Sequence, residues 1–163
     1  MEKVVKQDIE RRMARYNEAC RKSGAKLTHQ RMEIFREVAQ TGDHPDAEKV
    51  FQGVRERMPT VSLDTVYRTL WWLKGLGLIT TLGSSRERTR FDANLSRHHH
   101  FVCVQCGLTR DFYSDNFDKL TLPESLQSIG HVETTQVVVK GLCLKCASDE
   151  QSVAKKQRKE ETL

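Results

Sequence analysis

Apolar residues recur every three or four positions through the first half of the chain, and this spacing gives way to alternation in the second half. Spacing of the first kind lines one face of a helix, so it predicts helices. We expect four of them, around residues 9–20, 28–42, 46–59 and 62–74. Their predicted N-caps share a short oxygen-bearing side chain that can accept a hydrogen bond from the first turn. These N-caps are Thr28, Asp46 and Ser62.

A short hairpin follows the fourth predicted helix. Residues 78–82 and 89–92 read as strands on either side of a Gly-Ser-Ser turn. Three arginines cluster around this hairpin: Arg86, Arg88 and Arg90. Several helices followed by a basic hairpin predict a winged helix, in which the last helix enters the major groove of DNA and the hairpin contacts the backbone.

The fourth predicted helix has two distinct faces. Its apolar residues share one arc of a helical wheel: Leu63, Val66, Leu70 and Leu73. Thr65, Arg68 and Trp72 fall opposite, with Tyr67 at the boundary. Hydroxyls, a guanidinium and an indole on one face suit a DNA groove. The alternative is a surface helix whose tryptophan packs on a neighbouring element.

The second half predicts a small α+β unit. Residues 101–104, 108–113 and 135–139 read as strands, and residues 117–126 read as a helix interrupted near Pro123. This half holds too little apolar material for an independent core, so metal binding and self-association are expected to stabilise it. We therefore expect a DNA-binding domain at residues 1–92 and a metal-binding dimerisation domain at 93–147. Residues 148–163 are expected to form a fraying helix or a disordered tail.

Four cysteines form two C-x-x-C pairs in the second half: Cys103, Cys106, Cys143 and Cys146. Two such pairs supply four thiolates for one tetrahedral cation, which predicts a structural Zn2+ site with no open position. A redox C-x-x-C motif or two disulfides are the alternatives. A redox motif usually occurs once, near a βαβ pattern that this chain lacks. Cys20 lies on a helical apolar stripe and is interpreted as a buried thiol.

A second group of metal-ligand residues lies at the joint between the two halves. His98 and His100 point the same way if they lie in a strand, and Asp92 precedes them. Imidazoles with a carboxylate suit Fe2+, Mn2+ or Zn2+. Asp111 is a candidate fourth ligand, and a solvated histidine run is the alternative. The other histidines, His29, His44 and His131, are interpreted as ordinary surface or packing residues.

Charge is distributed unevenly along the 163 residues, whose net charge is +5. Residues 1–92 carry 18 basic and 13 acidic side chains, or +5, whereas residues 93–163 carry 9 of each. A basic first half favours a nucleic-acid partner. No apolar run reaches membrane-spanning length and no signal region opens the chain, so we expect no membrane association and a cytoplasmic, reducing location. No catalytic residues are expected.

The order of these motifs resembles the ferric uptake regulator (Fur) family. The resemblance rests on four segments besides the cysteine pairs: residues 27–31 (Leu-Thr-His-Gln-Arg), residues 62–70 (Ser-Leu-Asp-Thr-Val-Tyr-Arg-Thr-Leu), residues 90–92 (Arg-Phe-Asp) and His98-x-His100. It implies a homodimeric, metal-dependent transcription factor, usually a repressor. It further implies that Tyr67 and Arg68 lie on the recognition helix. The regulatory Fe2+ or Mn2+ would be held by Asp92, His98, His100 and Asp111, and the DNA would be an A·T-rich palindromic operator.

Several positions depart from the family pattern. His29 stands where a proline is usual. Met32 stands where many members supply a histidine ligand, and a thioether is a poor ligand for a hard cation. We therefore expect a regulatory site that is four-coordinate, weaker in its affinity for metal, or completed by water. Thr134 and Thr135 occupy the region where a histidine of an additional site is common, so that site is expected to be absent.

The subtype has two candidate assignments. Asp92 and Asp111 resemble the peroxide-sensing branch, whereas Arg68 resembles the iron-uptake branch. Two rival functions come from other classes, a zinc-containing dithiol redox protein and a zinc-ribbon module that binds protein. Both leave the basic helix and hairpin of the first half unexplained.

Overall fold

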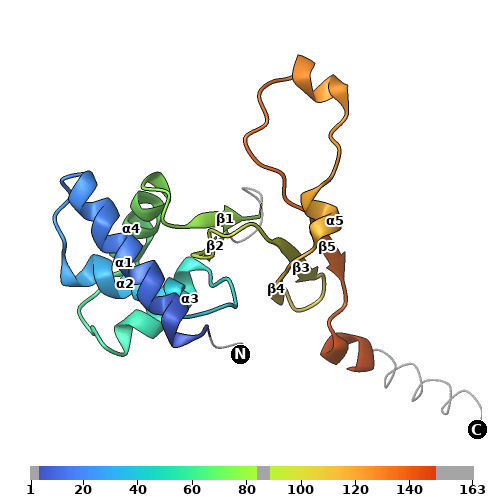
Figure 1. Cartoon of the computed structure of the whole chain (residues 1–163). Coiled ribbons are helices and arrows are strands. Elements are labelled where there is room, and N and C mark those ends of the chain that lie inside the picture. The colour runs from blue at the N-terminus through green and yellow to red at the C-terminus, as the bar shows by residue number, and fades with distance from the viewer. Residues whose placement is uncertain (1–3, 84–88, 150–163) are drawn as a thin grey trace, which may run out of the picture. The chain divides into compact units, whose positions relative to one another are not determined.

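The computed structural model describes residues 4–83 and 89–149. The chain divides into two compact units, Met1–Ser96 and Arg97–Leu163. The first unit contains four helices: α1 (Lys6–Lys22), α2 (His29–Ala39), α3 (Ala47–Arg55) and α4 (Leu63–Gly75). Two short strands follow, β1 (Thr80–Leu82) and β2 (Arg90–Asp92), which pair antiparallel. Figure 1 shows this order from blue to yellow-green.

The three predicted N-caps are confirmed. Thr28 accepts a hydrogen bond from the Arg31 backbone N–H, Asp46 from Lys49, and Ser62 from Thr65. Each bond satisfies one of the N–H groups that the first helical turn leaves without a partner. The starts of α2, α3 and α4 are therefore fixed locally.

A glycine ends α4. Gly77 has a φ of +66°, a conformation that side chains with a Cβ disfavour. Its N–H donates to the Lys74 carbonyl, and the Leu78 N–H donates to the Leu73 carbonyl. Leu73 and Leu78 are both buried and lie on either side of the turn, as in a Schellman motif. The turn redirects the chain from the helix into β1.

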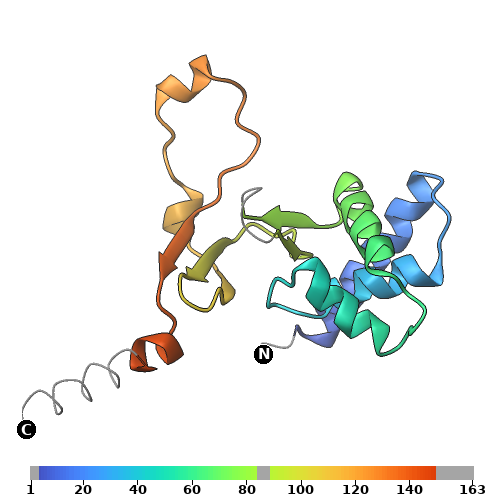
Figure 2. The ribbon, with the colours of Figure 1, turned by 180° about the vertical axis from the view of Figure 1, so that it is seen from behind.

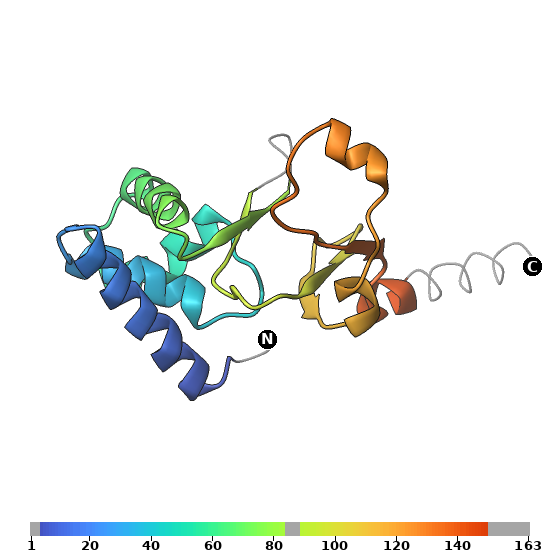
Figure 3. The ribbon, with the colours of Figure 1, turned by 45° about the horizontal axis from the view of Figure 1, so that its top comes forward.

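The core of the first unit fills the space between the helices and the hairpin. Helix α2 contacts α1, α3 and α4, and these helices are seen from another side in Figure 3. As predicted, Val66, Leu70 and Leu73 of α4 are buried. Burying such side chains is the main stabilising contribution to a fold of this kind. Other fully buried members include Tyr16, Ile34, Phe35, Val50, Leu78, Ile79 and Phe91.

The second unit is built on a three-stranded sheet with the order β4-β3-β5. Strand β3 (His99–Cys103) pairs antiparallel with β4 (Thr109–Phe112) and parallel with β5 (Val138–Gly141). Residues 135–139 were expected to form the last strand, and the observed strand starts three residues later and ends two residues later. The shift follows from hydrogen bonding, since the sheet pairs His100 with Val138 and Cys103 with Gly141.

A long excursion separates β4 from β5. It contains α5 (Asp115–Asp118) and the 3-10 helix η1 (Glu124–Ser128), where a single interrupted helix was expected. In Figures 1 and 2 the excursion loops away from the sheet of its own unit. Most of its apolar side chains are exposed, so it adds little to the core of this unit. Exposed apolar side chains here include Leu120, Leu122, Ile129 and Val132.

The charged tail that we expected from residue 148 lies almost wholly outside the described residues. Residues 144–149 are helical. No helix in the part of the chain that the structure describes has the length and apolar character needed to cross a membrane.

Candidate metal centres and nucleic-acid interface

The four cysteines of the two C-x-x-C pairs meet at one end of the sheet. Cys103 ends β3 and its register partner on β5 is Gly141, so the two cysteine turns start side by side. The four sulfur atoms all lie within 4.8 Å of one another, and those of Cys106 and Cys143 are 3.7 Å apart. A tetrahedron with Zn–S bonds of about 2.3 Å separates its sulfurs by roughly 3.8 Å. The cluster therefore fits a four-thiolate zinc site.

The cysteines are free thiols in this structure. The 3.7 Å between Cys106 and Cys143 is far longer than a disulfide bond of about 2.05 Å. The alternative of two disulfides is therefore wrong. Cys20 is buried in the first unit among core residues, as predicted.

The thiols of this cluster differ in acidity. Hydrogen bonds from backbone N–H groups, first that of Cys106 and then that of Cys143, lower the pKa of Cys103 to about 6. The Cys143 side chain, followed by burial, raises the pKa of Cys146 to about 12. The first thiol ionises readily, while a further thiolate would add like charge in a crowded site. A divalent cation offsets that repulsion, so metal binding releases protons.

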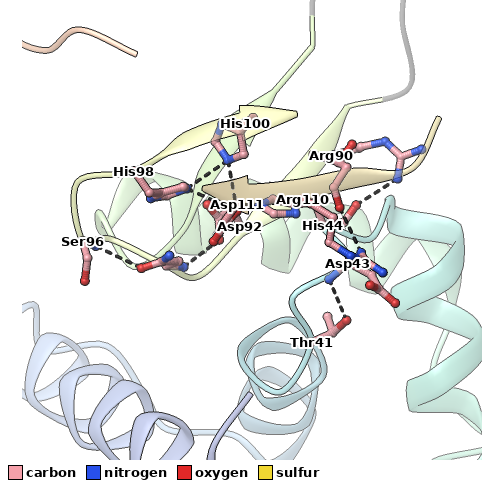
Figure 4. A network of polar contacts seen from close by, with 12 residues as sticks. Thr41, Asp43, His44, Arg90, Asp92, Ser96, His98, His100, Arg110 and Asp111 are labelled. Carbon is pink, nitrogen blue, oxygen red and sulfur yellow. Dashed lines mark hydrogen bonds and ion pairs between the residues drawn. The ribbon is translucent and has the colours of Figure 1, made fainter. Parts of the chain in front are cut away.

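Three metal-ligand side chains of the second unit converge on one face of the sheet. His100 on β3 is the register partner of Asp111 on β4, and His98 lies two residues earlier on the same face. The Nε2 atoms of His98 and His100 are 2.9 Å apart. The Asp111 Oδ1 atom lies 3.6 Å from the first and 3.5 Å from the second. Figure 4 shows these three side chains pointing toward one another.

This arrangement suits a cation. Both histidines are buried, and a neutral imidazole has one nitrogen whose lone pair can bind a cation. Two imidazole nitrogens and a carboxylate oxygen at mutual distances of 2.9–3.6 Å form a facial set of N/O ligands. Such a set suits Fe2+, Mn2+ or Zn2+. The solvated-run alternative for these histidines is wrong, since they are less than a tenth exposed.

The first unit contributes a separate pair, His44 and Asp92. The His44 Nε2 atom lies 3.5 Å from Asp92 Oδ2, and both side chains are buried. Asp92 Oδ1 accepts a hydrogen bond from the Asn94 N–H at 2.7 Å. Figure 4 also shows this pair. His44 was interpreted as a surface or packing histidine; it is buried, and its ring faces a carboxylate inside the unit.

The backbone around His44 is unusual. Its φ is +47°, and among the described residues no other non-glycine residue has a positive φ. The Arg90 guanidinium donates to the His44 carbonyl at 3.1 Å, and the Phe91 N–H donates to the Pro45 carbonyl. A strained residue that its neighbours hold in place often serves a functional site. Sequence spacing gave no sign of this pair, since 47 residues separate His44 from Asp92.

Met32 packs against the core of the first unit and is half-buried. A histidine of the same unit, His44, lies beside Asp92.

His99 faces the opposite side of β3 from His98 and His100. Its Nδ1 atom accepts a hydrogen bond from the Val137 N–H at 3.3 Å, and its Nε2 atom lies 3.4 Å from Asp118 Oδ1. Arg97 also binds this Asp118 oxygen, at 3.0 Å. The alternation of a strand predicts the reversal. This cluster connects β3 with α5 behind the His98–His100 face.

The predicted DNA-contacting residues of α4 are solvent-accessible. Tyr67 and Arg68 are exposed, and Thr65 is half-buried with its hydroxyl 2.8 Å from that of Ser62. Arg68 lies 3.8 Å from Asp64, an exposed pair one turn apart that leaves the guanidinium available. Trp72 is half-buried, as the alternative reading of this helix expected for a packed tryptophan. Arg86 and Arg88 lie outside the described residues.

A winged helix followed by a cysteine-rich α/β unit defines a class of DNA-binding proteins that carry metal sites. The Ferric uptake regulator family model matches residues 22–138, most of the chain. The protein belongs to the ferric uptake regulator family.

Curated relatives extend this comparison. The peroxide-responsive repressor PerR of Staphylococcus epidermidis is 28% identical over 133 residues, covering 80% of this chain and 87% of the relative. PerR of Staphylococcus aureus strain USA300 is 26% identical over 140 residues, covering 86% of this chain and 95% of the relative. Within the family the chain thus lies near the PerR branch.

Among solved structures, the Helicobacter pylori ferric uptake regulator Fur has a similar fold. Its TM-score is 0.69 with 21% identity, and the match covers 90% of this chain and 97% of that one. That structure is described as revealing three functional metal-binding sites. The fold of this chain is accordingly the predicted α+β arrangement of a winged helix and a small α/β domain.

Proposed function

We propose that this protein is a metal-dependent transcriptional repressor that binds double-stranded DNA as a homodimer. The observation that carries the proposal is the placement of metal-ligand residues on both units of a winged-helix protein. Asp92 ends the hairpin of the first unit, and His98 opens the ligand set of the second unit six residues later. Family membership and the PerR relatives support it.

We further propose that one Fe2+ or Mn2+ ion takes ligands from both units. The pair His44–Asp92 and the trio His98, His100 and Asp111 are each too small to fill the coordination shell of such an ion. Together they supply three nitrogens and two carboxylates. Shared ligands would couple metal binding in the second unit to the DNA-binding unit, because metal favours the arrangement to which it binds best.

Residues 1–92 are then the DNA-binding domain and residues 93–147 the metal-binding dimerisation domain. The Cys103, Cys106, Cys143 and Cys146 site is structural, since four thiolates leave no open position on Zn2+. Thr65, Tyr67 and Arg68 contact bases or sugars, and Arg86, Arg88 and Arg90 contact phosphates. Part of the hydrogen-bonding capacity of Arg90 already holds the His44 carbonyl.

A gel shift on an A·T-rich palindromic duplex, with and without Mn2+, tests the proposal. We expect Mn2+ to strengthen binding by the zinc-containing protein. The His100→Ala variant should keep its zinc and its dimer but lose the response to Mn2+, and His131→Ala, at an exposed histidine, is the control. Equal responses of wild type and His100→Ala would contradict the proposal.

Peroxide sensing is the finer part of the proposal. Fe2+ held by these ligands would activate hydrogen peroxide: one peroxide oxygen would be added to a ligand imidazole, which loses two electrons, and the other would leave as water. His98 and His100 are the targets that the sequence predicts, and His44 is a third ligand imidazole in this proposal. Met32 can gain oxygen as a sulfoxide. Loss of an imidazole ligand weakens the site, and the repressor leaves its operator.

Mass spectrometry after mild peroxide treatment separates peroxide sensing from a plain iron response. One added oxygen on the His98–His100 peptide, in iron-loaded but not manganese-loaded protein, supports sensing. If the iron-loaded protein stays unmodified and still binds DNA, the protein is an iron-responsive repressor and not a peroxide sensor.

A further inference from the structure

A basic groove lies in the first unit between the start of α2 and the exposed face of α4. Its volume is about 490 Å3. Three cations line it, Lys26, Arg31 and Arg68, together with threonine hydroxyls and the indole of Trp72. The lining residues that the structure describes include no carboxylate. Three positive charges and several hydroxyl donors without a carboxylate favour an anion.

Arg31 is the residue that the structure holds most firmly in this groove. Its guanidinium carbon lies 4.2 Å from the centre of the Trp72 ring, which is within cation–π range. One guanidinium nitrogen donates to the Lys26 carbonyl at 3.1 Å. These two contacts use one face and one N–H of the guanidinium. Four of its five N–H donors remain for a ligand.

The start of α2 adds donors next to this guanidinium. The Thr28 oxygen accepts the Arg31 N–H as the N-cap, so its hydroxyl hydrogen is available to donate outward. The positive end of the helix dipole further favours an anion at this point. The guanidinium N–H groups of Arg31 and the hydroxyl of Thr28 can therefore donate hydrogen bonds to the oxygens of one anion.

We propose that this groove binds one phosphate of the DNA backbone, with Arg31 as its principal contact and Trp72 as the platform that orients Arg31. The inference rests on the proposed DNA binding and adds a second element, α2, to the interface that α4 provides. Such a contact fixes the position of α4 on the duplex without reading sequence.

The test measures how the dissociation constant of the full-length, metal-loaded protein varies with salt concentration. Two duplexes are used, an A·T-rich palindrome and a mixed sequence. Arg31→Ala should reduce the salt slope by about two units and weaken binding at least about tenfold near 0.1 M salt, because each protomer of the dimer loses one counterion-releasing contact. The loss should be equal on both duplexes.

Arg55→Ala is the matched control, since Arg55 lies over the Phe51 ring at 5.6 Å on α3 and is absent from the groove lining. This variant should have the same salt slope and the same affinity for both duplexes as the wild type. Arg31→Lys retains the charge but loses the planar fork. We expect it to keep the wild-type slope and bind about two- to fivefold more weakly, from loss of stacking on Trp72.

The proposed phosphate site would be overturned if Arg31→Ala had the same salt slope and the same DNA affinity as Arg55→Ala, with an unchanged melting temperature. A loss confined to the palindrome would also overturn it, because it would indicate base readout. Failure of the wild-type protein to bind either duplex would instead contradict the proposed function itself.

Discussion

At the scale of single residues, His44 combines burial, a carboxylate neighbour and a positive φ. The loop that carries it is held by Arg90 and by the Phe91–Pro45 hydrogen bond. A residue that its neighbours hold in a strained backbone conformation often serves a functional site. We attribute this function to its imidazole as a ligand of the regulatory metal.

The first prediction concerns His44→Asn. Asparagine tolerates positive φ, so this change removes the imidazole with little change in backbone strain. We expect affinity for Mn2+ to fall at least about tenfold, since losing even a partner of a ligand costs 10–100-fold. Isothermal titration calorimetry measures the change. His29→Asn, at an exposed histidine of the same unit, should bind Mn2+ like wild type.

Single residues also decide the zinc site. Cys103→Ser should release the zinc and destabilise the second unit, because the metal contributes its binding energy directly to folding. Metal analysis and thermal unfolding measure the two effects, and Cys20→Ser at the buried thiol of the first unit should retain zinc. In wild type, the four zinc-bound thiols, like the buried thiol of Cys20, should stay unreactive until denaturant is added. Reduced protein that folds stably without zinc would contradict this prediction.

At the scale of elements, α4 is aligned by its own ends. Ser62 caps its first turn and the Gly77 turn closes its last. The helix thereby presents Tyr67 and Arg68 outward while Val66 and Leu70 face the core. Recognition consequently depends on the cap as well as on the contacting side chains.

Ser62→Ala should cost about 1 kcal/mol of unfolding free energy, the usual contribution of an N-cap. Urea unfolding measures it. The matched control is Ser128→Ala, in the short helix η1, where the hydroxyl donates to a carbonyl instead of accepting from a helix start. A loss below about 0.3 kcal/mol would show that the Ser62 cap contributes little to this helix.

Arg68→Ala tests the same helix by its contacts. We expect binding to the palindrome to weaken by about 1–3 kcal/mol and discrimination against a mixed sequence to fall, as for loss of a base contact. This outcome differs from the one expected for Arg31, whose loss should be equal on both duplexes. Competition gel shifts compare the two variants. An Arg68→Ala protein with wild-type affinity and specificity would mean that α4 is not the recognition helix.

At the scale of the whole molecule, the second unit leaves many apolar side chains exposed. Strand β5 is an edge of its sheet, with Val138 and Val139 accessible to solvent. An exposed edge and apolar side chains favour pairing with another chain. A homodimer formed through this unit would cover these side chains. It would also supply two DNA-binding units, one for each half-site of a palindrome.

The variant Ile129→Asp/Val132→Asp tests this association. Ile129 is 80% exposed, so aspartate there should not disturb the fold of the monomer. We expect self-association to weaken at least about tenfold, because charges must be desolvated in the interface. Sedimentation equilibrium measures it, with Val5→Asp as the control in the first unit. A variant that dimerises like wild type would exclude this surface from the interface.

The sequence by itself determined the elements whose causes are local. Helical spacing predicted α1 to α4, side-chain caps predicted the starts of α2 to α4, and C-x-x-C spacing predicted the thiolate cluster. Strand alternation placed His98 and His100 on one face. These results depend on residues within a few positions of one another, so one sequence is enough to find them.

Only the tertiary structure decided which distant residues meet. His44 lies beside Asp92 because backbone hydrogen bonds hold its loop against β2, and no spacing rule connects residues so far apart. The register of β5 is likewise set by its partner β3, which moved the start of the strand three residues from its expected position. Arg31 lies over Trp72 for the same reason, since packing of α2 on α4 joins two helices that the sequence leaves separate.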